Sequence, residues 1–303
     1  MTRPSGAQFD IGSGDQRAVV VEVGGGLRSY FIGDRSVVDG YSEDAMADGA
    51  RGQTLAPWPN RVRDGQWSWQ GTDLQLALTE PEQHNAIHGL ARWLRWRLVT
   101  HTNDAVSLEC TVSPQPGYPW TVEVRNDWSI GEGGLSVRTT VTNHSSAVAP
   151  IGVGFHPYLA MGPTIDGVLL TVPADTRLLT GEQQIPIGSE AVAGTGYDFR
   201  TPRRVGQLRV DHTFTGLHRD DDGRCAVRLA HPETGDAVEL WVDEAYPYLV
   251  IFTGDSLPDE RRRRQGLAVE PMTMPPNGLV TGEGVVVLEP EQQWVGRWGI
   301  VPG

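Results

Sequence analysis

Polar and apolar side chains alternate with a period of two along much of the chain. The alternation is clearest over 94–98, 106–112, 120–124, 135–141 and 238–242. Successive side chains of a β-strand point to opposite faces of its sheet. The pattern therefore predicts antiparallel strands with one face on a core and the other in water.

Turn-forming sequences separate the predicted strands. Gly, Asp and Pro cluster at 131–134, 220–223 and 232–235. No stretch of about 12 residues or more carries the apolar stripe of a helix. We therefore expect an all-β protein built mainly from two large packed sheets. Because no linker, change in composition or internal repeat interrupts residues 1–303, a single domain is predicted.

Charge and composition exclude several classes of protein. A net charge of −13 argues against nucleic acid as the main partner, since phosphate binding needs a basic face. All 25 basic residues are arginine, so neither a Schiff-base lysine nor the lysine of a phosphate-binding loop is available. Cys110 and Cys225 form neither a metal-binding cluster nor a disulfide framework.

The N-terminal sequence has no apolar segment of the kind that a secretory signal needs. No apolar run approaches the roughly 18 residues of a membrane-spanning helix. We therefore expect a cytoplasmic protein with no membrane partner.

Two prolines restrict the backbone of the segment Pro57–Val62 beside Asn60 and Arg61. Asn60 offers both a donor and an acceptor, and Arg61 offers a rigid fork of donors. The segment is either part of a polar binding site or a tight turn with a solvated arginine.

The segment His84–Gly89 holds two histidines four residues apart. A zinc-protease helix has Glu after its first histidine, where this chain has Asn85, and Gly89 disfavours a continuing helix. A metal site is therefore not expected, whereas His88 is a candidate for a polar contact with a ligand.

Two later segments place a titratable side chain in apolar surroundings. His156 follows a β-like run, and Pro157 biases it toward an extended backbone that can present the imidazole from a strand end. Glu270 interrupts an apolar strand between Val269 and Met272. Burial there would raise the pKa of Glu270 toward the range of a base that works at neutral pH.

Together and in this order, these segments resemble the aldose 1-epimerase (galactose mutarotase) family. The resemblance extends from about Gly24 to Glu291. It is carried by Asn-Arg at 60–61, His-Gly at 88–89, His-Pro-Tyr at 156–158, Asp-His-Thr-Phe at 211–214 and Glu-Pro-Met-Thr at 270–273.

The resemblance implies a large antiparallel β-supersandwich and a role for each matching residue. His156 is expected to be the general acid and Glu270 the general base. The residues expected to contact the sugar are Asn60, Arg61, His88 and Asp211, with Trp58 and Tyr158 as aromatic candidates for its C–H face. Mutarotation requires no cofactor and no metal, and the expected partner is a small sugar that binds a monomer or homodimer.

The Pro-Trp-Pro-Asn-Arg form is similar to a less characterised bacterial branch of the family, which leaves the sugar open. One such branch is associated with sulfoquinovose, and a related family with hexose 6-phosphates. The alternatives to a mutarotase of a free aldohexose are an enzyme specific for such anions, a carbohydrate-binding protein without catalysis, and a hydrolase or lyase on the same scaffold.

The run Arg261–Arg264 has two interpretations. It either forms a solvated loop that balances Asp255, Asp259 and Glu260, which we favour, or helps to recognise an anionic sugar.

Overall fold

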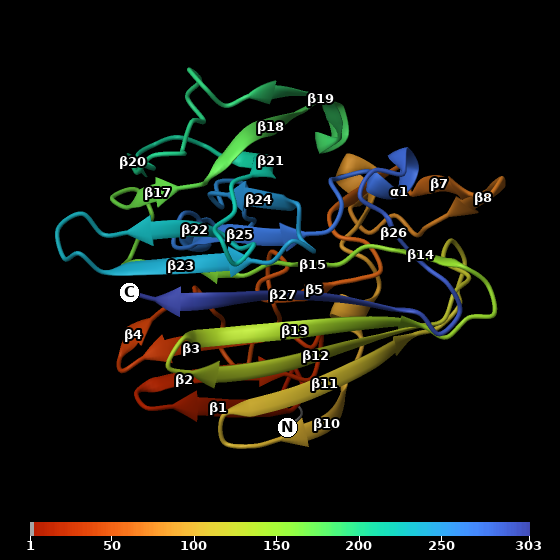
Figure 1. The fold of residues 1–303 in the computed structure, drawn as a ribbon, viewed down its shortest axis with the longest axis horizontal. Coiled ribbons are helices and arrows are strands. Elements are labelled where there is room, and N and C mark those ends of the chain that lie inside the picture. The colour runs from red at the N-terminus through yellow and green to blue at the C-terminus, as the bar shows by residue number, and fades with distance from the viewer. Residues whose placement is uncertain (1–2) are drawn as a thin grey trace.

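The computed structural model describes residues 3–303, which fold mainly into β-strands (Figure 1). Nine strands form the largest sheet, and every pairing within it is antiparallel. Their order across the sheet is β10 (Arg97–His101), β11 (Ala105–Val112), β12 (Val122–Gly131), β13 (Gly134–Asn143), β27 (Gln293–Pro302), β23 (Ala237–Val242), β22 (Cys225–Ala230), β17 (Leu169–Thr171) and β20 (Arg203–Arg204).

A second sheet, of eight strands, is also antiparallel throughout. Its order is β19 (Pro186–Ala191), β18 (Ala174–Thr180), β21 (Asp211–Leu217), β24 (Tyr248–Phe252), β25 (Leu267–Met272), β15 (Gly154–Phe155) and β5 (Thr54–Leu55), with β16 (Tyr158–Leu159) also paired to β25. The strand β25, which carries Glu270, therefore lies inside the sheet rather than at its edge.

Smaller units complete the fold. A four-stranded sheet contains β1 (Gln8–Ser13), β2 (Gln16–Val21), β3 (Leu27–Ile32) and β4 (Arg35–Ser36). Three pairs join β6 (Arg61–Arg63) to β9 (Asn85–Ile87), β7 (Gln66–Trp69) to β8 (Thr72–Gln75), and β14 (Ala149–Ile151) to β26 (Val286–Leu288). The helical segments are α1 (Gly278–Thr281) and the 3-10 turns η1 (Pro81–Gln83), η2 (Ala91–Trp93), η3 (Glu182–Gln184) and η4 (Glu260–Arg262).

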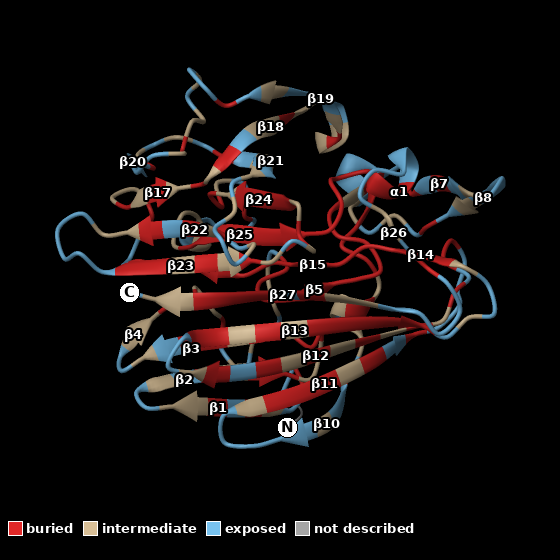
Figure 2. Cartoon of the chain, viewed as in Figure 1, coloured by how far each residue is buried: buried red, intermediate tan, exposed pale blue. Residues whose placement is uncertain are grey.

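Aromatic side chains join the two large sheets. The ring of Phe155, on the eight-stranded sheet, lies 6.3 Å from that of Trp128 and 5.0 Å from that of Trp298, both on the nine-stranded sheet. These residues belong to one hydrophobic cluster that runs from Phe9 to Ile300. Figure 2 shows the corresponding buried stretches along β13, β23, β25 and β27. The sandwich expected from the alternating pattern is confirmed.

Most of the predicted strands are present, with one partial error. The alternation over 94–98 predicts a strand with Leu98 on its buried face, but β10 begins only at Arg97 and Leu98 is 42% exposed. The reason is topological, because β10 is the outer strand of its sheet. No helix within the described residues 3–303 is long and apolar enough to cross a membrane.

The alternation of side chains along a strand also explains how polar residues reach the candidate site. Phe155 points into the core, so the next residue, His156, emerges on the opposite side of the backbone. On β25, Val269 packs in the core and Glu270 faces away from it. The eight-stranded sheet thus has one face committed to the core and a second face available for chemistry.

Candidate active site

His156 and Glu270, predicted from separate segments, lie in direct contact. The Nε2 atom of His156 is 3.3 Å from Oε1 of Glu270. The two residues are only 5% and 2% exposed. Within residues 3–303, no protein group hydrogen-bonds to Nδ1 of His156 or to Oε2 of Glu270. Because buried polar atoms are normally paired, these free positions mark where a polar ligand can bind.

Burial favours the uncharged form of both groups. It lowers the pKa of His156 to about 3, with the positive charge of Arg51 adding to the effect. Burial also raises the pKa of Glu270 well above its usual 4.5, and the nearby carboxylate of Asp211 adds to this rise. A neutral imidazole beside a carboxylic acid holds the same single proton as an imidazolium beside a carboxylate. The pair can therefore exchange the roles of acid and base without gaining or losing a proton.

His88 lies against this pair in a fixed protonation state. Its ring is edge-on to that of His156, with centroids 5.4 Å apart. The backbone N–H of Asn60 donates to Nδ1 of His88 at 3.2 Å, and the N–H of His88 donates to the carbonyl of Asn60 at 2.9 Å. Because Nδ1 must accept, the proton of the neutral ring sits on Nε2, which makes His88 a hydrogen-bond donor. Burial lowers the pKa of His88 well below 6.5 and so maintains this neutral form.

Asn60 and His88 both have left-handed backbones, with φ of 54° and 64°. Such values are uncommon outside glycine and are frequent at ligand-binding sites. The left-handed turns allow the two segments to approach each other closely, and this holds Asn60 beside His88.

Arg61 is aimed by a partner that the sequence analysis did not find. Its Nε and Nη2 donate to the two carboxylate oxygens of Glu80 at 2.8 and 2.9 Å. Glu80 also accepts from Nδ2 of Asn85 at 3.0 Å. The bidentate geometry fixes the guanidinium plane. No local signal marks Glu80, because the contact depends on the pairing of β6 with β9.

Asp211 joins the same face of the eight-stranded sheet as Glu270. In the strand registers, Glu270 lies opposite Val250, and Asp211 lies opposite Phe252, two residues further along the same strand. Side chains at positions two apart share a face. Phe252 is thus an aromatic residue of the site face that sequence reasoning missed.

Asp211 lines two adjoining hollows. One small cavity also contacts Asn60 and Arg61, while a cavity of about 350 Å³ adds Phe252 and Arg209. The larger volume is typical of a site for a small molecule. Crowding by protein atoms raises the pKa of Asp211, which Arg61 opposes.

The two predicted aromatic contacts are placed differently from expectation. Trp58 is 2% exposed and packs in the main hydrophobic core, with no free ring face for a sugar. Tyr158 is also buried and stacks on the ring of His156, with centroids 5.0 Å apart and an interplanar angle of 17°. The order of residues along the chain does not reveal which ring faces are already covered by protein.

His84 is separate from His88. It is exposed, and its Nδ1 lies 2.7 Å from a carboxylate oxygen of Asp64. A strand, β9, runs between the two histidines, so their spacing does not put them on one helix face. Across the described part of the chain, no three His, Cys, Asp or Glu side chains come together in a way that could hold a metal ion.

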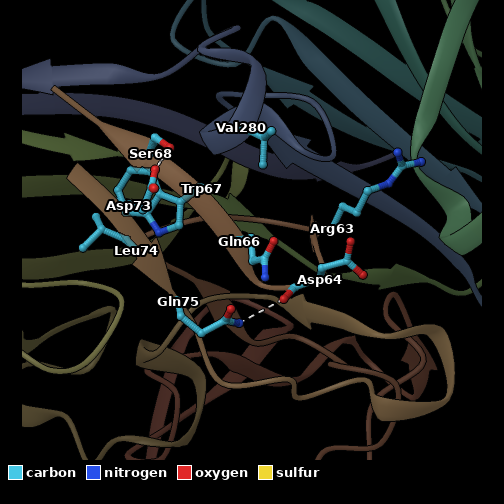
Figure 3. Close-up of a pocket in the computed structure, with 9 residues that line it drawn as sticks. All are labelled: Arg63, Asp64, Gln66, Trp67, Ser68, Asp73, Leu74, Gln75 and Val280. Atoms are coloured by element: carbon cyan, nitrogen blue, oxygen red, sulfur yellow. Dashed lines mark hydrogen bonds between the residues drawn. The ribbon is translucent and has the colours of Figure 1, made fainter. Parts of the chain in front are cut away.

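A roomier hollow lies elsewhere on the molecule. It has a volume of about 580 Å³ and follows β7 and β8, with Arg63, Asp64 and Gln75 among its lining residues (Figure 3). None of the residues predicted to act on the sugar lines it. Size alone is therefore a weak guide here, and the convergence of buried titratable groups makes His156, Glu270 and His88 the stronger candidate site.

The arginine run is paired with acidic residues. Arg261 bonds to Asp259, Arg263 to Glu260 and Arg264 to Asp255. This agrees with the interpretation of a charge-balanced loop. The remaining member, Arg262, donates to Asp39 at 2.8 Å.

Comparison with known proteins identifies the family. The family model for aldose 1-epimerase matches residues 8–300. The chain belongs to the aldose 1-epimerase family. It is accordingly an isomerase of the mutarotase class.

Two curated relatives are similar over most of this chain. An uncharacterised Escherichia coli K12 protein, YihR, is 31% identical over 287 residues, which cover 94% of this chain and 90% of that protein. The maltose epimerase of Levilactobacillus brevis is 26% identical over 248 residues, which cover 74% of this chain and 71% of that protein. The similarity to an uncharacterised bacterial protein agrees with the branch indicated by the Pro-Trp-Pro-Asn-Arg form.

Solved structures share the fold. A putative aldose 1-epimerase from Escherichia coli K12 superimposes with a TM-score of 0.85 at 21% identity, covering 98% of this chain and 99% of that one. The galactose 1-epimerase of Lactobacillus acidophilus NCFM gives a TM-score of 0.79 at 20% identity, with coverage of 96% and 93%. The antiparallel β-supersandwich expected from the resemblance is thus confirmed.

Proposed function

We propose that this protein interconverts the α and β anomers of a free aldohexose, with His156 and Glu270 as the proton-transfer pair. The observation that carries the proposal is their buried contact at 3.3 Å, in which each residue has one polar atom that no group of residues 3–303 hydrogen-bonds. A proton donor and a proton acceptor, shielded from water and close together, are what opening a hemiacetal requires.

In the proposed reaction, the proton of the neutral pair first passes from Glu270 to His156. Glu270 then takes the proton of the anomeric hydroxyl while the imidazolium of His156 protonates the ring oxygen. The C1–O5 bond breaks and leaves an open-chain aldehyde. Rotation about C1–C2 presents the other face of the carbonyl to the C5 hydroxyl. Ring closure returns both protons, so the pair ends as it began. Donors from His88 and Arg61 and the acceptor Asp211 hold the other hydroxyls during the rotation.

A neutral sugar is the better-supported substrate. The members Arg261, Arg263 and Arg264 of the arginine run are engaged by neighbouring carboxylates, and the net charge of −13 does not favour approach of an anion. The maltose and galactose epimerases among the similar proteins are named for neutral sugars. An enzyme for a sulfonated or phosphorylated hexose is the alternative, in which Arg61 or Arg209 would meet the anionic group.

A binding protein without catalysis is less compatible with the site. A buried carboxyl group without a cationic partner destabilises a fold once it ionises, and sugar binding alone gives no reason to keep one. Hydrolysis would instead need two carboxylates acting across a glycosidic bond. Here Glu270 contacts an imidazole, and Asp211 faces the open cavity.

Polarimetry of freshly dissolved single anomers tests the proposal. We expect the protein to accelerate mutarotation of α-glucose, α-galactose or maltose. Glu270→Gln and His156→Asn should each lower the rate by about a hundredfold or more. His84→Asn, an exposed histidine outside the site, is the matched control and should retain the wild-type rate. Near-wild-type rates in both site variants would show that this pair does not transfer the protons.

A further inference from the structure

A buried arginine outside the predicted site, Arg51, lies close to His156 and is separated from it by one aromatic ring. Arg51 is 1% exposed. Its Nη1 donates to a carboxylate oxygen of Asp39 at 2.5 Å, and its Nε donates to Asp48 at 3.1 Å. Asp39 in turn binds Arg262. A buried guanidinium held by two carboxylates has little freedom to move.

Arg51 is connected to His156 through Tyr158. The Cζ atom of Arg51 lies 4.1 Å from the centroid of the Tyr158 ring. That ring is stacked on the imidazole of His156. The phenol hydroxyl of Tyr158 donates to the carbonyl of Gly49 at 3.0 Å, which fixes the ring in its own plane. The three side chains therefore form a continuous stack.

The backbone holds the same segments together. The N–H of Gly52, next to Arg51, donates to the carbonyl of His156 at 2.9 Å. The N–H of Asp39 donates to the carbonyl of Tyr158 at 2.8 Å. Because Asp39 also binds Arg51, the stack and its anchor are parts of one rigid unit.

We propose that Arg51 and Tyr158 are positioning residues, which hold the imidazole of His156 in the plane that directs Nε2 at Glu270. This rests on the proposed function of the pair. Within residues 3–303, no protein group hydrogen-bonds to Nδ1 of His156, so no bond at that atom fixes the orientation of the ring. The stack of Arg51 and Tyr158 on the imidazole fixes that orientation instead. Because neither residue reaches the sugar, the loss of either should lower the rate of the reaction step more than the affinity for substrate.

Arg51 also contributes charge. The groups that act on the His156 ring are Glu270, His88, Tyr158, Arg51, Arg61 and Arg92. Of the three arginines, Arg51 has the largest effect, and it disfavours an imidazolium. Removing its charge should therefore make His156 easier to protonate.

Four variants separate orientation from charge. Tyr158→Leu should lower kcat by about tenfold or more and change KM by less than about threefold, whereas Tyr158→Phe, which keeps the stack, should stay within about threefold in kcat. Arg51→Lys should lower kcat but leave unchanged the pH at which kcat/KM falls on the acid side. Arg51→Gln should lower kcat and also move that fall to higher pH, because His156 becomes easier to protonate. Arg262→Gln, which keeps the stack and loses one bond to Asp39, is the matched control and should retain kcat.

Equal kcat in Tyr158→Leu and wild type would overturn the proposal, as would a loss confined to KM. If these variants do not fold, a measurement on the wild-type protein still tests the proposal. In a ¹⁵N-histidine NMR titration, His156 should stay neutral and keep a single tautomer from pH 8 to pH 5. Exchange between tautomers over this range would show that nothing holds the ring, and titration near 6.5, the ordinary value for a free imidazole, would show that burial and Arg51 do not keep it neutral. Failure of the proposed function has a different signature, namely wild-type rates in His156→Asn and Glu270→Gln.

Discussion

Replacement of Glu270 by Gln should increase thermal stability, and increasingly so as the pH rises. Glu270 is 2% exposed, and among the described residues 3–303 its one basic partner within salt-bridge distance is His156, whose own pKa is lowered by burial. Its folded-state pKa lies well above 4.5. Glutamine has nearly the same shape and cannot ionise, so it removes the penalty of a buried charge.

The sign follows from proton linkage. Because the folded protein binds this proton more tightly than the unfolded chain does, the stabilisation is complete below pH of about 4.5. It is lost as the pH rises toward the folded-state pKa. Each pH unit in that window removes about 1.4 kcal/mol. For 303 residues, an unfolding entropy of about 2.1 cal/mol/K per residue gives about 0.6 kcal/mol/K. The Tm difference between variant and wild type should therefore grow by about 2 °C per pH unit.

Calorimetry of both proteins at several values from pH 5 to pH 8 measures this difference. Glu80→Gln is the matched control with the opposite sign. The ion pair with Arg61 lowers the pKa of Glu80, although burial opposes the effect, so this variant should be less stable than wild type at pH 7 and approach it as the pH falls. A Tm difference for Glu270→Gln that stays constant from pH 5 to pH 8 would refute the reasoning, because Glu270 would then already be ionised at pH 5.

Three further predictions concern substrate and metal. Arg61→Lys should raise KM for a neutral hexose by about threefold, since a lysine cannot reproduce both bonds to Glu80, and steady-state polarimetry measures it; an unchanged KM would show that Arg61 does not orient the sugar. In competition at two ionic strengths, a sulfonated or phosphorylated hexose should not be preferred over the neutral sugar by about tenfold in kcat/KM, or about 1.4 kcal/mol; a preference of that size that weakens with salt would instead favour the anionic substrate. Prolonged treatment with a chelator should leave turnover unchanged, because the described residues assemble no ligand set, and activity restored by one divalent ion would contradict this.

Candidate site residues could be predicted from the sequence where a polar residue stands in a segment that is otherwise apolar. A carboxylate inside an apolar strand predicts burial and a raised pKa, and Glu270 shows both. A histidine between a strand-like run and a proline predicts an imidazole at a strand end, which is where His156 lies. In both cases the signal is local, since it depends on neighbours within a few residues.

The contacts that orient these groups could not be found in this way. Glu80 reaches Arg61 because it bridges to Asn85 of β9, which pairs with β6. Arg51 reaches His156 through Tyr158, more than a hundred positions further along the chain. Trp58 looked like a free aromatic ring, but its position in the core covers it. Contacts between such distant segments leave no periodicity or fixed spacing in the sequence from which they could be predicted.

The sequence by itself determined the class of fold, since a period of two with frequent turns admits few other arrangements of apolar side chains. It also determined the order of the motifs that mark the family. The tertiary structure alone decided which polar atoms face one another, which ring faces are open and which arginines are already paired. The physical reason is that burial and hydrogen bonding are set by strands from distant segments. Those strands meet only when the eight-stranded sheet forms, with one face on the core and the other carrying Glu270 beside His156.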